Sequence, residues 1–132
     1  MIGKSTPLSG LRLLLVEDEA MVAMMVEDML NALGCVVVEV AGSVSTGLAL
    51  AGDDALEIDG AVLDVNLGAE TVYPVAEALK AKGVPFVFST GYGTAGIEAS
   101  FAGVPILAKP YELRTLEKQL IAALRPAAGG GA

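Results

Sequence analysis

Five short runs of apolar residues alternate along the chain with segments of helical periodicity. The runs cover residues 11–16, 35–40, 60–65, 84–89 and 104–108. Most of them are apolar at consecutive rather than alternate positions, which is typical of strands buried on both faces of a parallel sheet. The pattern therefore predicts a five-stranded parallel sheet with helices on both sides.

The segments between the runs predict the helices. Helices are expected at about residues 19–33, 43–51, 71–82 and 112–124, and a short, weakly held one within the Gly- and Ala-rich stretch 91–103. Gly34 is expected to end the first helix in a left-handed conformation, and Pro74 is tolerated because it falls in a first turn.

Two of these helices have a clear inward face. Apolar residues recur at the spacing of one helix face, which predicts that they point to the core. They are Val72, Val75, Ala76 and Leu79 in the third helix, and Leu113, Leu116 and Leu120 in the last.

Strands that alternate with helices imply right-handed crossovers and an α/β sandwich of three layers. Five strands in a chain of this length fit the strand order 2-1-3-4-5. In such sheets ligands bind at the carboxyl ends of the strands, so the chemistry is expected there.

Polar side chains stand at four of these five strand ends. Glu17 and Asp18 follow the first strand, Asp64 and Asn66 the third, Thr90 the fourth and Lys109 the fifth. The second strand ends in Val40-Ala41-Gly42 and offers no polar side chain. The reactive groups are therefore expected to meet on one edge of the sheet.

Three converging carboxylates repel one another, and a hard divalent cation removes that cost. We expect Mg²⁺ or Mn²⁺, with Asp18 and Asp64 as direct ligands and Glu17 acting through a water molecule. Asn66 would contribute its main-chain carbonyl. One oxygen of Asp64 is then free to attack a phosphoryl group, while Lys109 and the Thr90 hydroxyl stabilise the developing charge.

Composition removes several other classes of function. The chain has 132 residues, a net charge of −8 and no histidine, which excludes Ser-His and Cys-His catalysis and His metal ligands. It has no cluster of Lys and Arg, so neither nucleic acid nor a membrane is an expected partner. The lone Cys35 lies in an apolar run and is expected to be buried, in keeping with a cytoplasmic protein.

The strand-end residues lie in motifs that resemble those of response-regulator receiver domains. The motifs are LLVEDE, VLDVNLG, FSTGYG and AKPY, and the resemblance covers nearly everything from Leu11 to Leu124. The stretch PFVFSTGYG also resembles a bacterial subclass of single-domain regulators with the motif Phe-Ala-Thr-Gly-Tyr. This resemblance implies a CheY-like, flavodoxin-like fold.

The same resemblance implies a function in a two-component phosphorelay. A sensor histidine kinase or histidine phosphotransfer protein would phosphorylate Asp64 with the help of Mg²⁺, and the domain would slowly dephosphorylate itself. The signal would switch the face around the fourth helix, fifth strand and fifth helix toward a downstream protein. Such a domain catalyses only its own phosphorylation and dephosphorylation and is not otherwise an enzyme.

The chain departs from the common receiver pattern at the switch. Many receivers carry an aromatic residue three positions before the lysine, where this chain has Ile106. Tyr92, two residues beyond Thr90, is therefore a candidate for the moving aromatic. The acidic pair is Glu-Asp rather than Asp-Asp, which keeps the charge.

Three other interpretations fit parts of the pattern. A degenerate receiver would act only as a protein docking module. A flavodoxin-like cofactor binder would use STGYGTAG to hold a phosphate, but the three acids after the first strand would repel one. An aspartyl-nucleophile phosphatase needs a similar set of groups, yet normally has its nucleophile on the first strand.

We expect residues 11–125 to form the receiver domain, preceded by an extension at 1–10 and followed by a disordered tail at 126–132. No output domain follows the last helix in the sequence, so a stand-alone receiver is expected.

Overall fold

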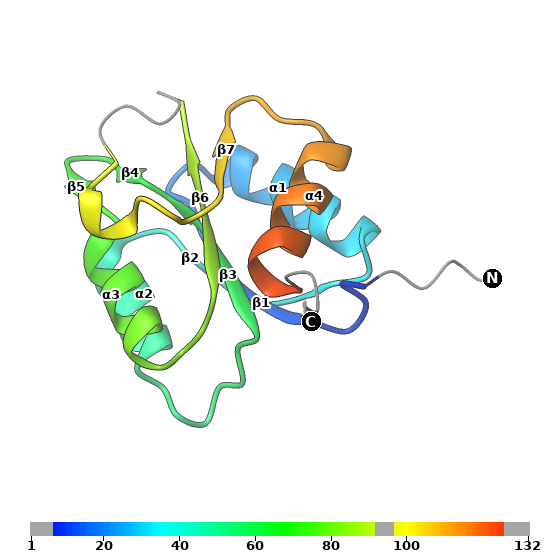
Figure 1. Cartoon of the computed structure of the whole chain (residues 1–132). Helices are drawn as coiled ribbons and strands as arrows, with labels where there is room; N and C mark the ends of the chain where they lie inside the picture. The colour runs from blue at the N-terminus through cyan, green and yellow to red at the C-terminus, as the bar shows by residue number, and fades with distance from the viewer. Residues whose placement is uncertain (1–6, 92–96, 126–132) are drawn as a thin grey trace.

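A five-stranded parallel sheet forms the centre of the computed structural model, which describes residues 7–91 and 97–125. Its strands are β1 (Arg12–Val16), β2 (Val36–Ala41), β3 (Gly60–Asp64), β6 (Phe86–Thr90) and β7 (Ile106–Ala108). They lie in the order β2-β1-β3-β6-β7 and every pair is parallel (Figure 1). The predicted fold class and strand order are confirmed.

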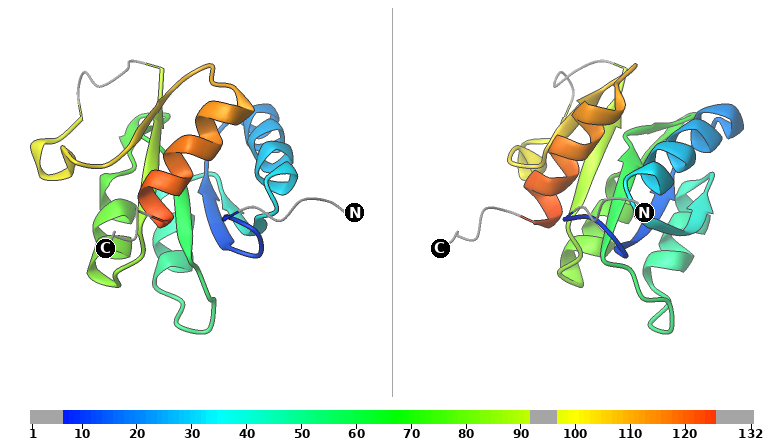
Figure 2. Two further views of the ribbon diagram at one scale, coloured as in Figure 1. Left: turned by 45° about the vertical axis from the view of Figure 1, so that its right-hand side comes forward. Right: turned by 90° about the vertical axis from the view of Figure 1, so that its right-hand side faces the viewer.

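Helices cover both faces of this sheet (Figures 1 and 2). Helices α1 (Ala20–Ala32) and α4 (Leu113–Leu124) lie on one face, and α2 (Val44–Ala51) and α3 (Tyr73–Ala81) on the other. No helix within the described ranges is long and apolar enough to cross a lipid bilayer.

The core has two halves because consecutive strand residues point to opposite faces. Leu14 and Leu63 pack under α2 and α3, whereas Leu13, Leu15 and Val62 pack under α1 and α4. All five are buried. This explains why the strands are apolar at consecutive positions.

Local signals set the ends of the helices. Gly34 follows α1 with a φ of 88°, a conformation that a Cβ disfavours, and the predicted stop is confirmed. The side chain of Ser43 accepts a hydrogen bond from the backbone N–H of Thr46 and caps α2. Pro74 lies in the first turn of α3, as predicted.

The predicted inward faces are confirmed with one exception. Every predicted core residue of α3 is buried, and so are Leu116 and Leu120 of α4. Leu113, however, is 41% exposed, so its predicted place in the core is wrong. It is the first residue of α4, and because helical side chains tilt toward the N-terminus, it projects past the helix end.

The hairpin after β3 and the burial of Leu8 were not predicted from the sequence. A two-stranded antiparallel hairpin, β4 (Asn66–Leu67) and β5 (Glu70–Thr71), follows β3 and turns at Gly68, whose φ is 65°. The short helix expected between the fourth and fifth sheet strands is a 3₁₀ turn, η1 (Ala99–Phe101), in the described part of that segment. Leu8, within the expected extension, is fully buried against the α1–α4 side of the core.

The β2 edge of the sheet is irregular. Its pairing with β1 shifts register between Leu13 and Leu14, so that Val37 and Glu39 are matched and Val38 is left over. Such a bulge bends and twists an edge strand. Four of the six residues of β2 are valines, and Val36 and Val40 are exposed.

Candidate functional site

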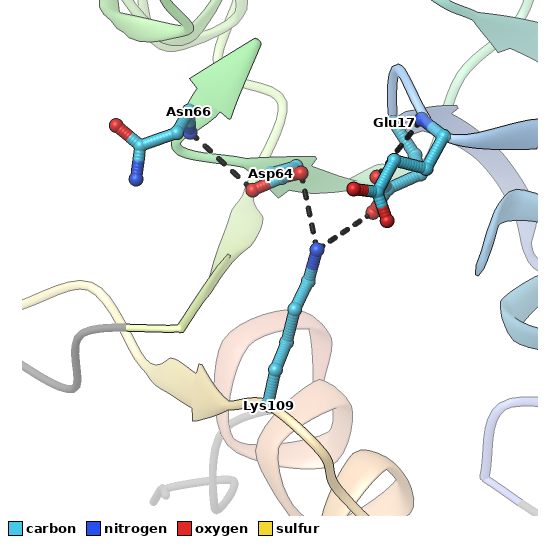
Figure 3. A network of polar contacts seen from close by, with 5 residues as sticks. Glu17, Asp64, Asn66 and Lys109 are labelled. Atoms are coloured by element: carbon cyan, nitrogen blue, oxygen red, sulfur yellow. Dashed lines mark hydrogen bonds and ion pairs between the residues drawn. The ribbon is translucent and has the colours of Figure 1, made fainter. Parts of the chain in front are cut away.

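Three predicted site residues meet at the carboxyl edge of the sheet (Figure 3). Glu17 directly follows β1, Asp64 ends β3, and Lys109 directly follows β7. Glu17 and Asp64 are almost fully buried, whereas the Lys109 side chain keeps a quarter of its surface exposed. These strands place the three side chains together although they lie far apart in sequence.

Lys109 joins the two buried acids. Its Nζ lies 3.0 Å from Glu17 Oε1 and 3.1 Å from Asp64 Oδ2, so one ammonium donates to both carboxylates (Figure 3). The remaining oxygens are also engaged. Asp64 Oδ1 accepts from the backbone N–H of Asn66 at 3.3 Å, and Glu17 Oε2 accepts from the backbone N–H of Glu19 at 3.2 Å. The acids are therefore fixed in position before any partner binds.

Asp18 completes an acidic cluster at this site. Glu17, Asp18 and Asp64 each offer one carboxylate oxygen, and these three oxygens lie within 4.8 Å of one another. Asp18 is exposed, so the cluster opens to solvent on one side. Several carboxylate oxygens at this spacing, with an open side for water, suit a hard divalent cation. The main chain of Asn66 lies beside the cluster, and its carbonyl as a ligand stays a prediction.

The charges of the site shift the pKa values of its groups. Burial raises the pKa of Glu17, and the negative charge of Asp64 adds to this, although the hydrogen bond from Lys109 opposes it. Burial acts to lower the pKa of Lys109, but the hydrogen bonds and charges of Glu17 and Asp64 outweigh it, and the pKa is raised. The side chain of Lys109 is therefore protonated. Its single positive charge is shared by the carboxylates of Glu17 and Asp64.

Thr90 ends β6 next to this group. It is buried, and its carbonyl accepts the backbone N–H of Lys109 at 2.9 Å, which ties the two predicted phosphoryl-binding residues together through the main chain. The contact of its hydroxyl with a phosphoryl group stays a prediction.

Of the two remaining predicted switch residues, the structure describes Ile106 but not Tyr92. Ile106 lies in β7, is partly buried and packs against the core under α2 and α3. It therefore fills core space at the position where the resemblance implies an aromatic residue. Tyr92 lies outside the described residues, so its proposed movement stays a prediction.

Two residues near the site were missed by the sequence analysis. Ser89 pairs in register with Asp64 on the neighbouring strand and is 2% exposed. Tyr111, two residues after Lys109, is partly buried against the core beneath α1 and α4. The signal for Ser89 was a polar residue at the penultimate position of a buried strand, and for Tyr111 its place just after Lys109-Pro110.

Comparison with solved structures places these features in a family. No family model matches the chain, and no curated protein sequence matches it. The solution structure of SdrG from Sphingomonas melonis Fr1 is 41% identical over 86% of this chain and 95% of that chain, with a TM-score of 0.75. The BeF3-activated conformation of SdrG from Pseudomonas melonis Fr1 is 43% identical over 86% of this chain and 97% of that one, with a TM-score of 0.72.

A third structure shares the fold at lower identity. The receiver domain of the sensor histidine kinase PA1611 from Pseudomonas aeruginosa PAO1, which has a magnesium ion coordinated in its active-site cleft, is 24% identical. The match covers 89% of this chain and 99% of that chain, with a TM-score of 0.75. The strand order, the lysine-bridged acids at the strand ends and the identity to SdrG lead to one conclusion: this chain belongs to the response-regulator receiver domains of two-component signalling.

Proposed function

We propose that this receiver accepts a phosphoryl group on Asp64 from a phosphohistidine of a sensor kinase or phosphotransfer protein. The observation that carries the proposal is the ammonium of Lys109, held at 3.0 Å from Glu17 and 3.1 Å from Asp64 at the mouth of the acidic cluster. A merely structural ion pair would need one acid, whereas three acids and one lysine leave the site negative and open to a cation.

The residues of the cluster fit a magnesium ion. Asp18 and Asp64 would hold it directly, Glu17 through a water molecule, and Asn66 with its main-chain carbonyl. The receiver domain of PA1611 binds magnesium in its own cleft, which supports the same use here. When bound, the ion would neutralise the cluster and draw charge from the phosphoryl oxygens.

The protein's own groups account for the rest of the transfer. One carboxylate oxygen of Asp64 attacks phosphorus in line, a new O–P bond forms, and the N–P bond of the phosphohistidine breaks. The imidazole leaves with the bonding electron pair and takes up a proton. Lys109 and the Thr90 hydroxyl bind the equatorial oxygens, where the developing charge is greatest. Water later hydrolyses the acyl phosphate, releases inorganic phosphate and restores Asp64.

The surface beside the site fits a protein donor. Met21, Met24 and Met25 of α1 are exposed by 84%, 65% and 54%. Met25 also lines an apolar hollow of about 260 Å³ together with Lys109 and Tyr111. A macromolecule that brings a phosphohistidine to Asp64 has to contact this face, and flexible thioether side chains adapt well to a partner. We therefore assign this face to the phosphodonor.

Intact mass after incubation with acetyl phosphate and Mg²⁺ tests the proposal. The wild type is expected to gain one phosphoryl group, and Asp64→Asn to gain none. Asp59→Asn is a matched control, since Asp59 accepts a hydrogen bond from the backbone of Arg12 in a loop before β3. A wild type that stays unmodified while binding its partners would make the chain a docking module instead.

A further inference from the structure

The buried hydroxyl of Ser89 is poorly satisfied in this structure. Its Oγ is inaccessible to solvent and has no hydrogen bond of ordinary length and angle among the described residues. Leaving a buried hydroxyl unpaired costs free energy, so such a group in a native protein calls for an explanation. Nothing in the transfer described above uses it.

The position of Ser89 is next to the reacting group. It lies opposite Asp64 on β3 and opposite Leu107 on β7. Side chains of paired residues in neighbouring strands project to the same face. Ser89 therefore lies on the same side of the sheet as the Asp64 carboxylate, within the layer that α1 and α4 cover.

The phenol of Tyr111 is the polar group that faces Ser89. Burial raises the pKa of Tyr111, while the Ser89 hydroxyl and the charge of Lys109 act in the other direction, which places its hydroxyl among these groups. The two hydroxyls are thus near each other without forming a standard hydrogen bond in the unmodified protein. In sites without a bound substrate, functional hydrogen bonds are often long and tighten only as the reaction proceeds.

Tyr111 also borders the stem of Lys109. Both line the hollow of about 260 Å³ with Pro110 between them and with Val22 and Met25 of α1 across from them. A lysine side chain is flexible, and an ammonium stabilises a transferring phosphoryl group only if it is held in place. Before transfer, Glu17 and Asp64 hold this ammonium, but Asp64 becomes the nucleophile. Glu17 then remains as the one acid that holds the ammonium, and a further group that fixes the lysine stem would keep Lys109 in place during transfer.

We propose that Ser89 and Tyr111 are positioning residues for Lys109, joined by a hydrogen bond that closes as Lys109 turns from the acids to the phosphoryl group. The inference rests on the proposed function of Asp64. The hollow beside Tyr111 provides the space for its ring to shift, so the unpaired Ser89 hydroxyl gains its partner in the phosphorylated state and in the transition state leading to it. This bond contributes to rate because it is stronger there than in the starting state.

A double-mutant cycle on the phosphorylation rate tests the pair. Ser89→Ala, Tyr111→Phe and the double variant are compared with the wild type, using acetyl phosphate at saturating Mg²⁺ and intact mass against time. Each single variant is expected to lower the rate constant about fivefold, the effect of one lost hydrogen bond, and the double variant no further. Ser89→Thr, which keeps a hydroxyl on a strand, is expected to restore the rate.

Tyr73→Phe is the matched control. Its phenol is also buried and accepts a hydrogen bond from the backbone N–H of Glu98, but it lies on the α2–α3 side of the sheet. Its loss is expected to lower the melting temperature and leave the phosphorylation rate unchanged. Single variants with the wild-type rate, or a double variant with the product of two independent losses, would overturn the proposal.

A spectroscopic readout separates positioning from stability. Beryllofluoride, which mimics a bound phosphoryl group, is expected to shift the Cε signal of Lys109 in the wild type and less in Ser89→Ala and Tyr111→Phe. An equal shift in all three overturns the pair's role in positioning Lys109. If the wild type takes up no phosphoryl group, the proposed function and this inference both fail; if wild type and variants react alike, this inference fails alone.

Discussion

Replacing Asp64 by asparagine is expected to stabilise the protein in the absence of metal. Two carboxylates 4.8 Å apart, the upper limit for this cluster, repel by about 3.5 kcal/mol at an effective dielectric of ~20. Asp64 faces two such neighbours, although water screens the exposed Asp18. The attraction to Lys109 at 3.1 Å is worth about 5 kcal/mol on the same scale.

These opposing energies nearly cancel, and the amide oxygen of asparagine can still accept the hydrogen bond from Lys109. Glu17 keeps its own bond to Lys109 and loses a negative neighbour. We therefore expect Asp64→Asn to raise the free energy of unfolding by about 1 kcal/mol, or the melting temperature by about 3–6 °C, in a chelating buffer.

Bound magnesium should reverse the order of stability of the wild type and Asp64→Asn. A ligand at one hundred times its dissociation constant stabilises the folded state by about 2.7 kcal/mol. The wild type gains this amount, while Asp64→Asn has lost a charged ligand and gains little. The wild type should then be the more stable of the two.

Urea unfolding with chelator and with saturating Mg²⁺ measures both differences. Asp28→Asn, an exposed change of the same kind on α1, should alter neither value by more than about 0.5 kcal/mol. If Asp64→Asn loses 1 kcal/mol or more in chelator, the favourable contacts of Asp64 exceed the repulsion, and our account of a charge-strained site is wrong.

Three further predictions concern the core and the donor face. Burial raises the pKa of Cys35 to about 11, so its neutral thiol favours the fold below a pH of about 8.5, and this contribution is lost as the pH rises through 11. Iodoacetamide at mildly alkaline pH should label it in urea but not in buffer, and equal labelling would contradict its burial. Gly47→Ala places a Cβ 2.9 Å from Val75 Cγ2. This overpacking should outweigh the gain in helix propensity and lower the free energy of unfolding, measured in urea, by about 1 kcal/mol. A stabilised variant would show that α2 can shift. Changing Met21 and Met24 to glutamine should slow transfer from a phosphohistidine protein about tenfold but leave acetyl phosphate labelling unchanged, and an equal effect on both donors would exclude this face.

Much of the fold followed from the sequence because its strands are buried on both faces. Runs such as residues 60–65 have no polar position until Asp64, which marks both the strand and its functional end. The convergence of Glu17, Asp64 and Lys109 then followed from strand order alone. These three residues could be named in advance because parallel strands end at one edge of a sheet.

The details that escaped prediction depend on contacts between distant segments. Leu113 has the spacing of a core residue, but its exposure depends on where α4 begins relative to the sheet. Ser89 is a small polar residue in an otherwise apolar strand, and its place beside Asp64 emerges only once β3 and β6 are paired. The hairpin at Gly68 is too short to leave a periodic pattern.

The irregular edge at β2 also bears on how the protein behaves at high concentration. A valine-rich outer strand with free backbone groups is a template for adding further strands, the first step toward fibrils. The unmatched Val38 breaks the regular spacing of those backbone groups, and Glu39 adds a charge beside it. Deleting Val38 would straighten this border and should make the purified domain prone to assemble into β-rich aggregates.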